Sequence, residues 1–158
     1  MEKALVNDSL ELTMPDGFRV MGNDEVKKAY GFDYDCLWGM RDEERHMMLT
    51  VIWKVSNKVL AKLGTAKIIA EQQDKGLRKR FKRMGYKSGD LRPIKIAGIE
   101  GCNFGYSYEL EGTTLACETS VVKDGTCCYS IYYYTREECD EENRALYEEI
   151  LASMKLVG

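Results

Sequence analysis

Residues 102–134 constrain the fold most strongly, because three apolar alternations follow one another with short turns between them. In the first, Cys102, Phe104, Tyr106, Tyr108 and Leu110 alternate with small or polar residues. Such a period of two is typical of a strand with one buried face. The dipeptides at 111–112 (Glu-Gly) and 124–125 (Asp-Gly) are typical of hairpin turns. The segment therefore predicts an antiparallel meander of three strands, at Cys102–Leu110, Thr114–Val122 and Thr126–Tyr134.

Further strands are predicted before this meander. Residues 9–14 (SLELTM) alternate and are followed by the turn sequence Pro-Asp-Gly, and the apolar side chains at 32, 34, 36, 38 and 40 also alternate. Residues 47–55 (MMLTVIWKV) are apolar on both faces, so we expect that strand to lie in the centre of the sheet. Because short turns join consecutive strands, the sheet should be largely antiparallel.

Three helices are predicted around this sheet. Asn23 or Asp24 can cap a short helix that ends near Gly31. A long helix begins at Thr65, carries an apolar stripe that includes Gln73 and Leu77, and ends at Gly85. A last helix begins at a capping box formed by Thr135 and Glu138. The fold class is therefore α+β, a central, largely antiparallel β-sheet flanked by helices.

Length and charge limit the class of protein. A chain of 158 residues with only two prolines fits one domain, residues 1–158, without a long linker. A net charge of -3 and a pI near 5.4 exclude a surface that is tuned throughout to nucleic acid or anionic lipid. The first residues, MEKALVNDSLELTMPDG, contain no apolar run long enough for a signal peptide or a membrane span. We therefore expect a cytoplasmic protein without membrane insertion.

The six cysteines do not show the spacing of a metal site or a redox motif. Cys127 and Cys128 are adjacent in a predicted strand, so their sulfurs should point to opposite faces of the sheet. We expect reduced, structural thiols and no metal or other cofactor. His46 is the only histidine, so an enzyme that uses imidazole chemistry would have to use it. No nucleotide, phosphate-binding or hydrolase motif accompanies it, and we predict no catalytic residues.

A basic segment, residues 75–95, contains nine basic residues and one acidic residue. With the apolar stripe of the helix facing the sheet, Arg78, Lys79, Lys82 and Arg83 should lie on its outer side. These four residues, the basic ridge, are candidates for binding an acidic partner or nucleic-acid phosphates. The alternative is that the ridge balances the acidic last helix, within the molecule or across a homodimer.

Four fragments together resemble the Mog/PsbP-like fold family, which includes PsbP, DcrB and related adaptor proteins. They are LTMPDGFRVM, IKIAGIEGCNFGYSYEL, CCYSIYYYT and ILASMKL. The resemblance spans nearly the whole chain and implies an α/β/α sandwich. It also implies binding to other proteins, and it offers no catalytic motif to carry over.

The functional prediction is accordingly a cytosolic protein-binding or chaperone/adaptor-like module without catalytic activity. Its partner should bind either the basic ridge or an aromatic patch on the outward face of the sheet, around Trp38 or Tyr132. Binding of nucleic acid or of an acidic partner by the helix at 75–95 is the alternative, and an enzyme that uses His46 is a further one.

Overall fold

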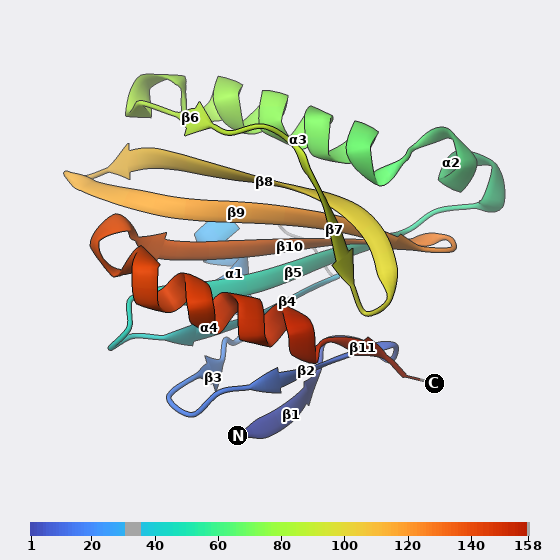
Figure 1. Ribbon diagram of the computed structural model, residues 1–158, viewed down its shortest axis with the longest axis horizontal. Coiled ribbons are helices and arrows are strands. Elements are labelled where there is room, and N and C mark those ends of the chain that lie inside the picture. The colour runs from blue at the N-terminus through green and yellow to red at the C-terminus, as the bar shows by residue number, and fades with distance from the viewer. Residues whose placement is uncertain (31–35, 158) are drawn as a thin grey trace.

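The computed structural model describes residues 1–30 and 36–157 and contains one large antiparallel sheet (Figure 1). The order of strands along its main path is β3-β4-β5-β10-β9-β8-β6, and β7 also pairs with β8. The bounds are β3 Arg19–Val20, β4 Leu37–Asp42, β5 Met47–Val55, β6 Lys87–Ser88, β7 Arg92–Ile96, β8 Ile99–Leu110, β9 Thr113–Asp124 and β10 Cys127–Arg136. The sequence-based fold class, α+β with helices packed on an antiparallel sheet, is confirmed.

The predicted meander is formed by β8, β9 and β10. In the turn between β8 and β9, Glu111 and Gly112 have φ values of 51° and 81°. Two successive positive φ values match the right-handed twist of a two-residue hairpin, and glycine adopts them without steric cost. β5 pairs with β10 on one side and with β4 on the other, so its predicted central position is also confirmed.

A second, smaller sheet was not predicted. It consists of β1 (Glu2–Leu5), β2 (Leu10–Met14) and β11 (Lys155–Leu156), with β2 in the middle. β2 is the strand expected from the alternation of Leu10, Leu12 and Met14, which are all buried. β11 follows the last helix by one residue, so this sheet joins the two ends of the chain.

Helices cover both faces of the large sheet. On one face, α4 (Asp140–Ser153) and the small sheet enclose the main core, which includes Leu12, Leu49, Ile131, Tyr133 and Tyr147. On the other face, α3 (Ala66–Arg80) packs on β8 and β9, and α1 (Asn23–Tyr30) packs on β4. A short helix, α2 (Lys58–Leu63), precedes α3. In Figure 1, α4 lies in front of the sheet and α1 behind it. The described helices are all too short or too polar to cross a bilayer.

Two helix boundaries differ from the predictions. The long helix ends at Arg80, and a 3₁₀ turn, η1 (Lys82–Met84), continues to Gly85 with its φ of 69°. The predicted capping box at the last helix is wrong. Thr135 is the penultimate residue of β10, and its buried Oγ1 accepts a hydrogen bond from Nδ2 of Asn143 at 2.8 Å. A 3₁₀ turn, η2 (Glu137–Cys139), then leads into α4.

The expected strand at 32–40 falls partly outside the described residues. Its first part, residues 32–35, lies there, and β4 begins at Leu37.

Thr65 caps α3 as predicted, because its Oγ1 accepts a hydrogen bond from the backbone N–H of Ile68. Cys127 packs against the main core and Cys128 against the core under α3, so the two thiols lie on opposite faces as expected. All six cysteines are free in the structure.

Candidate functional site

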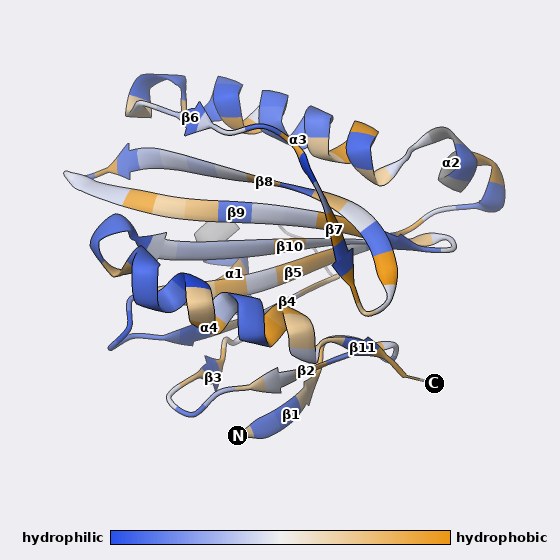
Figure 2. Cartoon of the chain, in the orientation of Figure 1, coloured by the Kyte–Doolittle hydropathy of each residue, from blue (hydrophilic) through white to orange (hydrophobic). Residues whose placement is uncertain are grey.

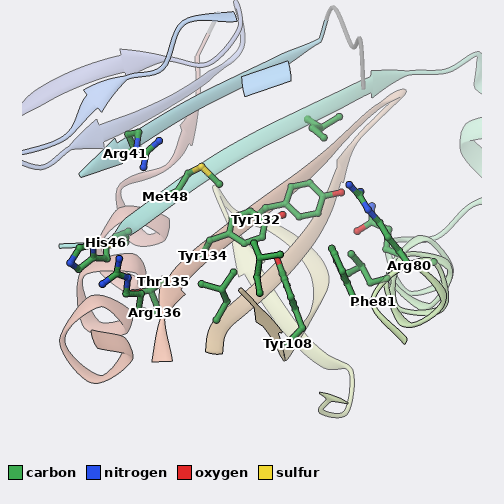
Figure 3. Close-up of a pocket in the computed structure, with 17 residues that line it drawn as sticks. Arg41, His46, Met48, Arg80, Phe81, Tyr108, Tyr132, Tyr134, Thr135 and Arg136 are labelled. Carbon is green, nitrogen blue, oxygen red and sulfur yellow. The ribbon is translucent and has the colours of Figure 1, made fainter. Parts of the chain in front are cut away.

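A groove of about 690 Å³ opens on the face of the sheet that carries α3 (Figure 3). β5 and β10 form its floor, α3 forms one wall, and residues at the β4–β5 turn stand on the opposite side. We call it the α3 groove. The residues that line it are Arg41, His46, Met47, Met48, Ile52, Gln73, Gly76, Leu77, Arg80, Phe81, Tyr108, Leu110, Leu115, Tyr132, Tyr134, Thr135 and Arg136.

The floor of the α3 groove is aromatic and aliphatic. Tyr132 and Tyr134 are two residues apart on β10, so the pleat places them on the same face. Their rings are stacked, with centroids 6.4 Å apart and planes 13° apart. On the adjacent strand β5, Met48 lies opposite Tyr134 and Thr50 lies opposite Tyr132. Ile52 is two residues beyond Thr50 on the same face of β5. These four side chains are half-buried, so the floor offers apolar contact area to an occupant.

The wall on α3 repeats at helical spacing. Gln73, Gly76, Leu77 and Arg80 are three or four residues apart and therefore lie on one side of the helix. A Cβ added to Gly76 would meet no atom within 4 Å, so this position leaves the groove open. Phe81, just beyond the helix, stacks on Tyr108 of β8 with ring centroids 4.1 Å apart and planes 4° apart. That stack joins the end of α3 to the sheet.

The charged side chains in the described lining of the α3 groove have one sign. Its described lining contains Arg41, Arg80 and Arg136 and no aspartate or glutamate. In Figure 3, Arg80 stands on the side of α3, toward which Tyr132 extends, and the other two arginines stand on the opposite side. Two carboxylates lie behind the rim, and they contact these arginines from outside the lining. Oε2 of Glu25 is 3.4 Å from Nη1 of Arg41, and Oε1 of Glu138 is 3.9 Å from Nη1 of Arg136.

Two side-chain atoms of the lining are buried without a hydrogen-bond partner. They are Nε of Arg41, on the β4 side, and Oε1 of Gln73, on α3. The other amide atom of Gln73, Nε2, donates to Oγ of Ser130 at 2.9 Å. Because a hydroxyl both donates and accepts, either orientation of the amide leaves one of its two polar atoms unpaired. Unpaired buried polar groups are uncommon and costly, so these two atoms are candidate contact points for an occupant of the groove.

His46 lies at the edge of the groove, in the β4–β5 turn, and its φ is 54°. It is exposed, and the described lining contains no carboxylate or thiol beside it. The geometry therefore supplies no partner for imidazole catalysis from within the groove. Among residues 1–30 and 36–157, no group of three or more His, Cys, Asp and Glu side chains could hold a metal ion.

The structure places the basic ridge outside the α3 groove. Lys79, Lys82 and Arg83 are exposed, and Figure 2 shows hydrophilic residues along much of α3. Arg78 is held by the protein itself, because Nη2 donates to Oγ of Ser88 at 2.6 Å and the guanidinium lies over the Tyr86 ring. Its ion pair is with Asp74 of the same helix, at 3.7 Å. α3 and α4 cover opposite faces, so the ridge does not pack against the acidic last helix.

Trp38 and Tyr132, the two aromatic candidates, also lie apart. Tyr132 is part of the floor of the α3 groove. Trp38 is half-buried and packs against the main core under α4, on the opposite face of the sheet. The two residues cannot belong to one patch, and the structure associates only Tyr132 with a groove.

Sequence reasoning missed the other residues that line the groove, above all Arg41, Arg80, Arg136 and Gln73. One signal was available. Gly76 lies within the helix on the same side as Gln73 and Arg80, and a helical glycine without a capping role is unusual. Arg41 and Arg136 gave no signal, because each is one arginine at the end of a strand.

No family model and no curated protein matches the chain. Solved structures do match. PsbP (CyanoP) from Synechocystis sp. PCC 6803 matches with a TM-score of 0.68 and 18% identity, over 95% of this chain and 88% of that one. LpqN of Mycobacterium tuberculosis, involved in cell envelope biogenesis, matches with a TM-score of 0.61 and 13% identity, over 94% and 83%. The Ran-binding protein Mog1p of Saccharomyces cerevisiae matches with a TM-score of 0.59 and 9% identity, over 94% and 90%.

These matches cover nearly the whole of each chain at identities below 20%. At that level of identity they establish the arrangement of strands and helices, and they agree with the resemblance inferred from the sequence. The chain therefore has the Mog1p/PsbP-like fold.

Proposed function

We propose that this protein is a protein-binding module of the adaptor type, without catalytic activity of its own, and that its partner binds in the α3 groove. The observation that carries the proposal is the combination of a tyrosine floor with arginines on both sides and no carboxylate in the described lining. Tyrosine and arginine are the residues that most often dominate the binding energy of protein interfaces.

The size and the apolar lining of the groove support this proposal. A volume of about 690 Å³ is large enough for several side chains of a partner. Met48 and Leu77 supply adaptable apolar contacts beside the rigid tyrosine rings. One solved structure of the same fold is that of a Ran-binding protein, and this analogy gives general support to the proposal.

Binding of nucleic acid by the basic ridge remains the alternative, because Lys79, Lys82 and Arg83 are exposed. The cytoplasmic location, the absence of catalysis and the homodimer stay predictions. A capture experiment distinguishes binding of a protein partner in the α3 groove from binding of nucleic acid by the basic ridge. Immobilised wild-type protein is incubated with native lysate, with and without nuclease, beside three variants.

The first variant, Gly76→Trp, fills the α3 groove with an indole ring, and the second, Gly76→Ala, adds only a methyl group. Space around this position is open, so both should fold. The third variant carries Lys79→Glu, Lys82→Glu and Arg83→Glu. We expect a specific partner to be retained by the wild type, by Gly76→Ala and by the ridge variant, and to be lost from Gly76→Trp. If Gly76→Trp retains the partner, the partner does not bind in the α3 groove. If the partner is lost on nuclease treatment or in the ridge variant, binding of nucleic acid by the basic ridge is favoured.

A further inference from the structure

We infer, on the basis of the proposed function, that the occupant of the α3 groove is an acidic peptide segment that carries large apolar side chains. The first argument is charge. Three arginines belong to the described lining, on both sides of the floor, and no carboxylate does. An occupant with negative charges at both edges would pair with them, whereas a basic segment would be repelled.

The second argument is the apolar floor. The side chains of Met48, Ile52 and Leu77 and the faces of two stacked tyrosines are available to the occupant. Leu110 and Leu115 continue this surface toward the far end of α3. Phenylalanine, leucine or methionine side chains of a peptide would bury area against it, and the exposed acidic residues of the same peptide would then reach the arginines.

The third argument distinguishes a peptide from a fatty acid of the same charge. Arg41 has a buried donor without an acceptor, and the amide of Gln73 has one buried polar atom without a partner. A peptide backbone supplies both a C=O group and an N–H group and can pair with either atom of this amide, whereas a fatty acid supplies acceptors only and cannot pair with an amide oxygen. Both atoms are shielded from solvent, so each side chain must rotate for the contact to form.

Single-stranded nucleic acid is the other polyanion that tyrosines can bind by stacking. The aliphatic part of the lining argues against it, because Met48, Ile52, Leu77, Leu110 and Leu115 offer no partner to the polar edges of bases.

The test is a selection from a display library of random dodecapeptides on the wild-type protein, with Gly76→Trp as the counter-selection. Enriched peptides are synthesised with a fluorescent label, and their affinities are measured by fluorescence polarisation at low and high salt. We expect enriched peptides to be acidic and to contain aromatic or leucine residues. Replacing a groove arginine, in Arg41→Gln or Arg80→Gln, should weaken binding about tenfold, the order expected for a lost charge-assisted hydrogen bond.

Arg83→Gln is the matched control, because Arg83 is exposed and outside the groove, and its affinity should equal that of the wild type. Thermal melting of each variant verifies that it is folded. Competition with dodecanoate and with an oligothymidylate tests the two other kinds of anion. Displacement of the peptides by either at lower concentration than by unlabelled peptide overturns the inference.

The possible failures are distinguishable. If peptides are enriched that Gly76→Trp does not bind, but they are neutral or basic, the groove is a protein-binding site and the inference about its partner is wrong. If no peptide is enriched in a way that depends on Gly76, both the inference and the peptide-binding role of the groove fall.

Discussion

The ring of Phe81 lies flat on the ring of Tyr108, with centroids 4.1 Å apart and planes 4° apart. This stack connects the residue just after α3 to strand β8, near the edge of the large sheet, and holds the end of the groove wall against the sheet. Replacing the ring in Phe81→Ala should lower the free energy of unfolding by about 2 kcal/mol, since a half-buried ring and its stacking are both lost. Urea denaturation measures the change. Ile68→Ala, at an exposed position of α3, should change the free energy of unfolding by less than about 0.5 kcal/mol.

Two glycine-to-alanine changes should have opposite effects. Gly76→Ala should raise the free energy of unfolding by about 0.5–1 kcal/mol, because alanine favours the helix and its Cβ has open space. At Gly101 of β8, an added Cβ would overlap the backbone oxygen of Val121 on β9. Gly101→Ala should therefore cost about 3 kcal/mol or prevent folding. Equal stabilities of the two variants in urea denaturation would contradict the close approach of β9 to Gly101.

Glu118 is a buried carboxylate that joins the sheet to α4. Its Oε1 accepts hydrogen bonds from Nη2 of Arg92 at 2.6 Å and from Nη1 of Arg144 at 3.1 Å. Glu118→Gln should lower the free energy of unfolding by about 1.5–3 kcal/mol, because a charge-assisted pair is replaced by a neutral amide. Glu100→Gln, at an exposed position of β8, is the matched control and should leave stability unchanged. A loss of stability in both variants would indicate a general effect of charge.

Glu25 should make stability depend on pH in the acidic range. Two hydrogen bonds from the Arg19 guanidinium, at 2.8 and 2.9 Å, lower the pKa of its carboxyl from 4.5 to about 2 in the folded protein. A pKa lowered by folding contributes stability above the unfolded value, and that contribution is lost as the pH falls from 4.5 toward 2. Thermal melting of wild type and Glu25→Gln should therefore show a difference at pH 7 that shrinks below pH 4.5. A constant difference would contradict this assignment.

The six thiols should differ in reactivity. Burial raises the pKa of the Cys117 thiol strongly, and it also raises the pKa of Cys102, whereas Cys36 is exposed. Because the thiolate is the reactive species, iodoacetamide should modify Cys36 first and Cys117 last. Mass spectrometry of tryptic peptides over a time course gives the order. Full unfolding in urea should make all six react at similar rates, and early labelling of Cys117 in the native protein would contradict its burial.

Local sterics explain what was predictable from the sequence. Alternation along 102–134 and the dipeptides at 111–112 and 124–125 each depend on neighbours only a few residues away. The same alternation was enough to separate Cys127 from Cys128, and the apolar residues on both faces of 47–55 were enough to predict that β5 is a central strand. Two of the four fragments that resemble the Mog/PsbP-like fold, IKIAGIEGCNFGYSYEL and CCYSIYYYT, overlap these locally determined segments, which is why the fold could be predicted.

Tertiary structure decided the features that depend on distant pairs. β11 is only two residues long and exists because it pairs with β2, near the other end of the chain. Thr135 has the sequence of a helix cap, yet pairing with Met47 and Ala116 keeps it in β10, since two complete ladders outweigh one capping bond. The α3 groove combines Arg41, Arg80 and Arg136 from three separate elements. Their approach depends on how α3 packs across the sheet, and no local pattern in the sequence encodes that packing.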